Sequence, residues 1–391
     1  MYKRSFYLAT CITACVLILS QCIGRKEDPR GDAFAGDATC SSCHPSAYAA
    51  HQHTAHAFAS APAGGHSVLG SFIAPNNSFL FPGNVVVRME QNKNRYYQSA
   101  YANGQLQEQA TFDITIGQGR KAQTYLSWHD GKYFQLPLSW FRPVNNWANS
   151  PGFPATYPYY KREIASSCFG CHSSYVQYET RFEGVRKTES FRENKVVFGI
   201  TCERCHGPAQ EHVAFHLQHP DEKSAHNITR IGQFTRQQQV DMCAVCHAGL
   251  KTPQRDLFEF RPGDRLSDYI MADYFATPAE QSANDVHGRQ YQLLTASKCF
   301  RMSNTMTCTT CHDPHQDQRT DLTAYTKKCM SCHQPGTANF CTSKEDIKVL
   351  QQQCVNCHMP EQPSSVITLL AGGQQQPIAD SLRSHLIKIY R

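Results

Sequence analysis

Apolar residues are scarce in this 391-residue chain, because hydrophobic types make up only 40% of it, on the low side for a globular protein. The sequence also has no run of basic residues and no glycine-rich loop of the kind that cradles phosphates. Its pI of about 8.4 is therefore poor evidence for a nucleic-acid partner, and we expect none. The shortage of apolar side chains indicates that something other than polypeptide supplies part of the core.

Cysteine and histidine, by contrast, are abundant, with 19 of each. Fourteen of the cysteines fall into seven copies of Cys-x-x-Cys-His, the attachment motif for c-type haem. The seven motifs, in chain order, are Cys40, Cys43 and His44; Cys168, Cys171 and His172; Cys202, Cys205 and His206; Cys243, Cys246 and His247; Cys308, Cys311 and His312; Cys329, Cys332 and His333; and Cys354, Cys357 and His358.

The spacing within the motif has a mechanical reason. Positions i, i+3 and i+4 of a helical turn lie on one face, so two thiols reach the vinyl groups of one porphyrin while the imidazole reaches its iron. Paired Cys-x-x-Cys units also bind zinc, but zinc needs no histidine after every second cysteine, and disulfide scaffolds belong to short domains. We expect seven covalently bound haem c groups, numbered here as haems 1–7 by motif, with the motif histidines as proximal iron ligands.

The N-terminus is typical of an export signal. A short basic segment precedes an apolar stretch, Leu8 to Leu19, that is too short to span a bilayer comfortably. We take residues 1–21 as the signal peptide. The sequence Leu19-Ser20-Gln21-Cys22 resembles a lipobox, which predicts a lipid anchor on Cys22; an ordinary cleaved signal or an uncleaved anchor is the alternative. With a lipid anchor or with its alternative, the protein is exported, and we expect it on the periplasmic side, in the outer membrane or at the cell surface.

The remaining chain divides by the spacing of the motifs. Residues 22–35 are expected to form a tether and 36–66 a first haem module. Residues 67–160 carry no motif but have β-prone runs joined at Asn103-Gly104 and Asp130-Gly131, which are hairpin turn signals. They predict a β-rich insert followed by an irregular connection.

Residues 161–391 are expected to hold six haems, in one continuous multihaem domain with 36–66. The short, polar segments between these motifs look helix-prone. The predicted fold is therefore mainly α with extensive irregular structure around a stack of haems, and with a small antiparallel β insert between haems 1 and 2. Cys299 and Cys341 belong to no motif, and in an oxidising compartment two leftover thiols suggest a disulfide.

Twelve histidines lie outside the motifs, enough to give every iron a second imidazole and so close it to substrates. His315 follows His312 by three residues and cannot reach the opposite side of the same porphyrin, so it would bind a neighbouring haem. The same geometry applies to His212, which follows the third motif.

Other histidines are less certain from the residues alone. One of the three in His51-Gln52-His53-Thr54-Ala55-His56 should be a ligand. His129 lies at a hairpin turn, where turn chemistry is an alternative to ligation. His287 and His385 stand alone on ordinary segments.

Several motif contexts resemble the cytochrome c-554-like family of multihaem cytochromes, over most of residues 36–391. They include ITCERCHGPAQEHV, TCTTCHDPH and CVNCHMP. The resemblance implies that the distal iron ligands are His56, His212, His287, His315 and His385, without assigning each to a haem. The family's namesake has four haems, so the seven motifs and the β insert depart from it.

Two main functions are compatible with these features. The first is an electron carrier whose mostly bis-His haems link redox partners: a membrane quinol-oxidising complex and a periplasmic or extracellular acceptor. The second is an oxidoreductase acting on a small nitrogen or sulfur compound, such as nitrite, hydroxylamine or tetrathionate, at one open haem. The chain has no Cys-x-x-Cys-Lys motif, which marks one such nitrite reductase. We favour the carrier and expect no catalytic residue; a third reading, haems that only hold a fold, ranks last.

Overall fold

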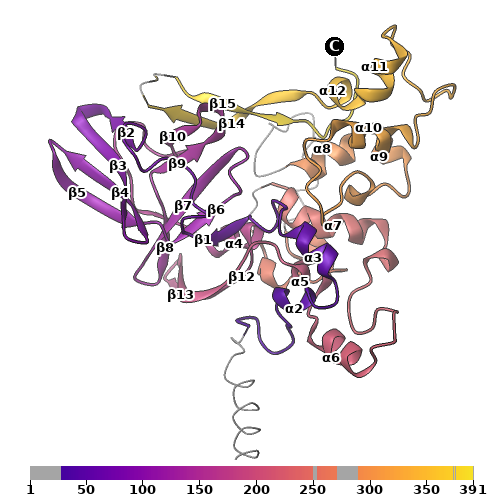
Figure 1. Cartoon of the computed structure of the whole chain (residues 1–391), viewed down its shortest axis with the longest axis horizontal. Helices are drawn as coiled ribbons and strands as arrows, with labels where there is room; N and C mark the ends of the chain where they lie inside the picture. The colour runs from indigo at the N-terminus through magenta and orange to yellow at the C-terminus, as the bar shows by residue number, and fades with distance from the viewer. Residues whose placement is uncertain (1–27, 250–252, 271–288, 373, 375, 391) are drawn as a thin grey trace, which may run out of the picture.

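A computed structural model describes residues 28–249, 253–270, 289–372, 374 and 376–390. Figure 1 shows strands gathered on one side of the molecule and short helices on the other. The expected signal peptide, Cys22 and His287 lie outside the described residues.

A nine-stranded antiparallel sheet dominates the β half. Its path runs β1 (Ser60–Pro62), β6 (Ile114–Ile116), β7 (Ala122–His129), β9 (Leu138–Phe141), β10 (Asn146–Asn149), β14 (Glu361–Ala371) and β15 (Ile378–Arg383), with β8 (Lys132–Gln135) pairing with β7 and with β11 (Arg162–Glu163). A second sheet has the order β2 (Ser78–Phe81), β3 (Val85–Asn92), β4 (Arg95–Ala102) and β5 (Gln105–Thr111). A long hairpin pairs β12 (Ser173–Glu183) with β13 (Arg186–Phe198).

Two hairpins form where their turn residues predict them. Asn103 and Gly104 join β4 to β5, and Asp130 and Gly131 join β7 to β8. All four residues have positive φ, between 47° and 78°, which is the backbone that a two-residue hairpin turn requires.

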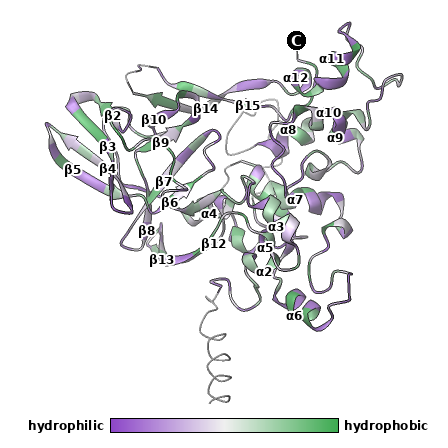
Figure 2. Ribbon diagram, in the orientation of Figure 1, coloured by the Kyte–Doolittle hydropathy of each residue, from purple (hydrophilic) through white to green (hydrophobic). Residues whose placement is uncertain are grey.

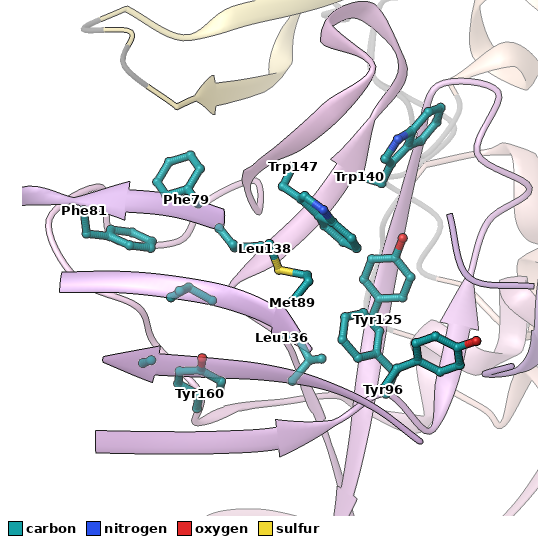
Figure 3. Packing of buried hydrophobic residues seen from close by; sticks show 13 residues of the cluster. Phe79, Phe81, Met89, Tyr96, Tyr125, Leu136, Leu138, Trp140, Trp147 and Tyr160 are labelled. Atoms are coloured by element: carbon teal, nitrogen blue, oxygen red, sulfur yellow. The ribbon is translucent and has the colours of Figure 1, made fainter. Parts of the chain in front are cut away.

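Aromatic residues fill the core between these strands. Figure 3 shows Met89 and Leu138 lying near the rings of Trp147 and Tyr125. Trp147 is 2% exposed and its indole N–H donates to the carbonyl of Ser71. Gly70, at φ 96°, lies so close that a Cβ there would sit 2.4 Å from the indole ring. The β half therefore has a protein core of its own.

The helical half consists of short segments around the motifs. The α-helices are α2 (Asp37–Cys40), α3 (Pro45–His51), α4 (Ser166–His172), α5 (Cys202–His206), α6 (Gln210–Gln218), α7 (Arg236–His247), α8 (Gln290–Ala296), α9 (Lys298–Met302), α10 (Leu322–Met330), α11 (Ile347–Gln352) and α12 (Cys354–His358). The 3-10 turns of this half are η3 (Ile231–Gln233), η4 (Leu257–Glu259), η5 (Leu266–Asp268) and η8 (Cys308–Thr310), whereas η1 (Pro82–Asn84) and η2 (Arg142–Val144) connect strands of the β half. Figure 2 shows polar and apolar residues interleaved along these elements.

The expectation of a mainly α fold with a small β insert is wrong. Among the described residues, strands hold more of the chain than α-helices do. The large sheet also takes β1 from the first haem module and β14 and β15 from the C-terminal region. The physical reason is long-range pairing: β14 joins the sheet through β10, which lies more than two hundred residues earlier, and no local pattern reveals such a partner.

Candidate haem-binding sites

Each motif forms a tight turn, as haem attachment requires. In the first, fifth and sixth motifs the histidine N–H donates to the carbonyl of the first cysteine, at 2.8–3.0 Å. The second, third and seventh motifs lie within α4, α5 and α12, and the fourth ends α7. This geometry puts both sulfur atoms and the imidazole of a motif on one face.

Four motif histidines face an imidazole from a distant segment. The pairs, with the distance between ring centres and the angle between ring planes, are His44 and His212 (6.4 Å, 13°), His206 and His315 (6.1 Å, 25°), His247 and His56 (6.2 Å, 60°), and His312 and His385 (6.1 Å, 26°).

These distances suit one metal ion between two rings. Imidazole nitrogens bind a first-row metal at about 2.0–2.1 Å and lie about 1.1 Å from the ring centre, so two trans ligands have centres about 6.3 Å apart. Aromatic pairs in proteins have ring centres about 4.5–7 Å apart, and these four pairs lie in the upper half of that range. The four pairs are spaced as two axial ligands of one haem iron would be.

Hydrogen bonds hold several of these rings by Nδ1, which leaves Nε2 for a metal. Nδ1 of His212 lies 2.7 Å from the carbonyl oxygen of His226. Nδ1 of His315 lies 3.2 Å from the carboxylate of Asp313. Partners of this kind fix the tautomer of a ligating imidazole and raise its basicity. The same arrangement joins the Nδ1 atoms of His333 and His358 to the carbonyl oxygens of Asn339 and Lys388.

Some of these imidazoles are both accessible and desolvated. The surface of His247 counts as exposed, yet burial by surrounding protein, followed by the charges of His56, His385 and nearby groups, lowers its pKa to about 4. His312 is also exposed, and burial again lowers its pKa.

The composition of the sequence points the same way. Hydrophobic residues make up only 40% of the chain, and large apolar cofactors between the motif segments would supply the missing core.

The sulfur atoms of neighbouring motifs lie near one another. In four pairs of motifs one thiol shifts the pKa of the other: Cys40 and Cys202, Cys171 and Cys246, Cys243 and Cys308, and Cys354 and Cys329. Cys205 also interacts with Cys246, and Cys311 with Cys332. The third and fourth motifs, and the fifth and sixth, are therefore neighbours as well, and all seven motifs form one connected group.

The alternative of structural zinc is not favoured. Within the described residues, the group of three side chains close enough to share an ion is Asp37, Cys40 and Cys202. Its two thiols come from different haem motifs, and Asp37 already accepts a hydrogen bond from the N–H of Cys202. A structural zinc site needs four ligands, mainly sulfur and nitrogen.

Other expected site residues are placed as follows. His51 is buried with Nδ1 lacking a partner among the described residues, whereas His53 is exposed. His129 is exposed and lies 3.0 Å from Asp130, in keeping with turn chemistry. Cys299 and Cys341 are both unbonded, as is every described cysteine, so their pairing stays a prediction.

Sequence reasoning missed two supporting groups. Asp313, in the Cys-His-Asp-Pro-His segment, also accepts the backbone N–H of His315 at 2.9 Å; its place between two histidines was the available signal. Glu203, inside the third motif, is buried and accepts hydrogen bonds from Arg30, Ala35 and Gly36. Nothing local in the sequence connects Glu203 to those residues.

Comparisons with known proteins agree with this geometry. Residues 149–207, which contain the second and third motifs, match the family model described as cytochrome c554 and c-prime. No curated protein matches the chain. In the described part, no helix has the length and apolar character needed to cross a membrane.

The fold is similar to that of the outer cell wall cytochrome OcwA, with a TM-score of 0.54 and 17% identity, over 91% of this chain and 80% of that one. At this identity the likeness shows the fold alone. The family match confirms the resemblance to the cytochrome c554 family over residues 149–207, and these residues contain two of the seven haem-attachment motifs.

Proposed function

We propose that this chain is an exported electron carrier in which seven haem c groups, most of them bound by two histidines, link two redox partners. The observation that carries the proposal is the set of four imidazole pairs at 6.1–6.4 Å. Haem c would supply reversible one-electron chemistry at each motif. The chain would attach each haem covalently, provide two histidine nitrogens for its iron and keep other ligands away from that iron.

The pairs assign distal ligands to four haems. In this proposal His212 serves haem 1, His315 haem 3, His56 haem 4 and His385 haem 5. Each distal histidine comes from a segment outside its own motif, so the haems cross-link the chain. An iron with two imidazoles has no open position for a substrate, which suits a conductor.

The contacts between motifs suggest an order for the conductor. They connect haem 1 to 3, 3 to 4, 4 to 5, 5 to 6 and 6 to 7, with haem 2 joined to haem 4. Figure 1 places α2, beside haem 1, and α12, which carries haem 7, at opposite ends of the helical half. The second cysteines of motifs 1, 6 and 7 are exposed. We propose that partners exchange electrons at these two ends.

The proposal is tested by replacing one distal ligand. His315→Ala should convert haem 3 to high spin and leave all seven haems attached, because attachment depends on the thioethers. Electron paramagnetic resonance of the ferric protein counts high-spin and low-spin irons, and intact mass counts haems. A wild-type protein with mostly high-spin irons would refute the carrier.

A lipid anchor completes the proposal. The lipobox-like Leu19-Ser20-Gln21-Cys22 would tether the cytochrome to a membrane on the periplasmic side or at the cell surface. Cys22→Ser should release the protein from the membrane fraction. Membrane binding and processing unchanged in this variant would refute the anchor.

A second function is favoured by one observation. The four imidazole pairs do not include His333 or His358, the motif histidines of haems 6 and 7, whose Nδ1 atoms lie beside backbone carbonyl oxygens. An open haem there would suit reduction or oxidation of a small nitrogen or sulfur compound. Stoichiometric carbon monoxide binding by the reduced protein, with turnover of nitrite or hydroxylamine, would select this oxidoreductase over the carrier.

A further inference from the structure

The loop that joins β6 to β7, residues 117–121, contacts three segments that carry proposed distal ligands. Both of its ends are fixed by backbone hydrogen bonds. The N–H of Gly117 donates to the carbonyl of Ala59 at 2.9 Å, and the carbonyl of Lys121 accepts the N–H of Arg142 at 2.8 Å. The loop is therefore held in place by the β half, and its side chains extend from a fixed base.

Arg120 reaches the segment of His315. Its guanidinium forms an ion pair with Asp317, two residues after His315. Residues 311–321 form no helix or strand, so their position depends on contacts such as this one. The side chains of Arg120 and Asp317 are 36% and 17% exposed, which shields the pair in part from water. The ion pair thus joins the segment of the proposed distal ligand of haem 3 to the β half.

Lys121 reaches the strand that leads to His385. Its ammonium lies 3.3 Å from the carboxylate of Asp380 and donates to the carbonyl of Ser381. The side chain of Asp380 is 2% exposed, and a buried carboxylate needs an opposite charge. The strand β15 ends two residues before His385 and runs from the β half toward the helical half (Figure 1). Lys121 therefore anchors the strand next to the proposed distal ligand of haem 5.

Gln118 connects a third segment to the same loop. Its side-chain amide donates to the carbonyl of His53 at 3.4 Å, three residues before His56. Its side-chain oxygen accepts a hydrogen bond from Nε of Arg120 at 3.1 Å. Gln118 thereby links the segment of His56 to the arginine that holds the segment of His315.

We propose that residues 117–121 form a clamp through which the β half positions distal haem ligands. In this clamp Arg120 is the positioning residue for His315, and Lys121 is the positioning residue for His385. The inference rests on the proposed ligation of haems 3 and 5. Partners outside the ligand itself fix the orientation of a ligating imidazole, and here they come from one loop that carries no haem motif.

The clamp has a spectroscopic consequence. The ring planes of His206 and His315 make an angle of 25°, and those of His312 and His385 an angle of 26°. The low-spin signal of a ferric haem with two imidazoles depends on the angle between the ring planes. Release of one segment should therefore shift the signal of its own haem and leave the signal of the other haem unchanged.

The experiment is low-temperature electron paramagnetic resonance of the ferric holoprotein. His315→Ala and His385→Ala identify haems 3 and 5, because each variant should remove one low-spin signal. Arg120→Gln should then shift the haem 3 signal alone, and Lys121→Gln the haem 5 signal alone. Exchange of the charges, Arg120→Asp together with Asp317→Arg, should restore the haem 3 signal, because it rebuilds the ion pair.

Two further variants test the specificity of the effect. Arg120→Lys keeps the charge opposite Asp317 and should retain the wild-type signal of haem 3. Lys132→Gln is the matched control, because Lys132 pairs with Glu163 at 2.8 Å on the same large sheet but outside the loop. It should shift neither signal. Intact mass checks that each variant keeps its haems.

The outcomes separate the clamp from the ligation. Separate shifts of haems 3 and 5, with rescue by charge exchange, support the clamp. Signals that stay unchanged in both loop variants overturn it, and so does an equal shift of both haems in each variant, which would indicate general loosening. If His315→Ala and His385→Ala leave every low-spin signal in place, the proposed ligation itself is refuted.

Discussion

His53 and His56 lie three residues apart in the turns that follow α3, and of the two it is His56 that faces a motif histidine in the described structure. Burial by surrounding protein lowers the pKa of His56, whereas His53 is exposed. The residues alone do not choose among the three histidines here, because the choice depends on where α7 brings His247; it was the family resemblance that pointed to His56. The residue type predicted that a histidine here binds iron, but only the folded structure shows which of the three imidazoles lies opposite His247.

The first prediction follows from this contrast. His56→Ala should convert haem 4 from low to high spin, since one of its two axial nitrogens is lost. His53→Ala is the matched control and should leave the ferric spectrum unchanged. Electron paramagnetic resonance of both variants measures the difference; a spin change in the His53 variant alone would contradict the assignment.

Among the helices and strands, features that adjacent residues specify were predicted correctly, whereas pairings between distant segments could not be predicted from the sequence. The Asn103-Gly104 and Asp130-Gly131 turns formed as predicted, because two adjacent residues specify the backbone. The joining of β14 to β10 could not be predicted, since a strand's partner depends on burial and packing across the sheet. The same limit applies to ligands: nothing near His44 indicates that His212 will face it.

The second prediction concerns the loop that ends β13. Gly199 has φ 66°, and a Cβ there would lie 2.3 Å from the carbonyl oxygen of Ala57. Next to it, the N–H of Ile200 donates to the carbonyl of His56. Gly199→Ala should therefore displace the His56 segment and alter the spectrum of haem 4.

Gly184 offers a matched control for that variant. Its φ is 63°, but a Cβ there would meet nothing within 4 Å. Gly184→Ala carries similar backbone strain without the clash and should leave haem 4 unaffected. Equal perturbation of haem 4 by both variants would show that strain, and not contact with Ala57, is responsible.

The third prediction concerns the segment that precedes α2. Arg30 bonds to Glu203 at 2.6 Å and to Asp28 at 2.8 Å, and its side chain is 5% exposed. Removing one partner of a buried pair typically costs about 3–5 kcal/mol. Glu203→Ala should therefore release residues 28–36 from the third motif, seen as faster hydrogen exchange of that segment. Glu211→Ala, in the first turn of α6, should leave the exchange unchanged.

Acid should release the same segment. Burial raises the pKa of Asp28, but hydrogen bonds from Arg30 outweigh it and lower that pKa below its usual value. Because the pKa of Asp28 is lowered on folding, the pair stabilises the folded state fully above the unfolded pKa of about 3.9. This stabilisation is lost as the pH falls through the pKa of Asp28 in the folded protein. The protection of residues 28–36 from hydrogen exchange, relative to the intrinsic rate at each pH, should stay constant from pH 7 to 4 and fall at lower pH. Loss of protection already near pH 6 would contradict the assignment.

For the whole molecule, the fourth prediction is a count. Intact mass of mature protein should show seven haem additions, and at least four irons should be low spin, one for each imidazole pair. Reduced protein should bind carbon monoxide weakly or not at all if the remaining irons are also closed. Fewer than four low-spin irons would show that the ring pairs do not act as ligands.

The crossed ligand pairs also bear on how the protein is made. Contact order, the average sequence separation of contacting groups, rises when rings such as His44 and His212 must meet, and folding slows as it rises. Attachment to a motif needs only five consecutive residues, so it can precede any long-range contact. Haem insertion can therefore come first, on an extended chain, and the slow closure of the ligand pairs would then be the step that completes the native protein.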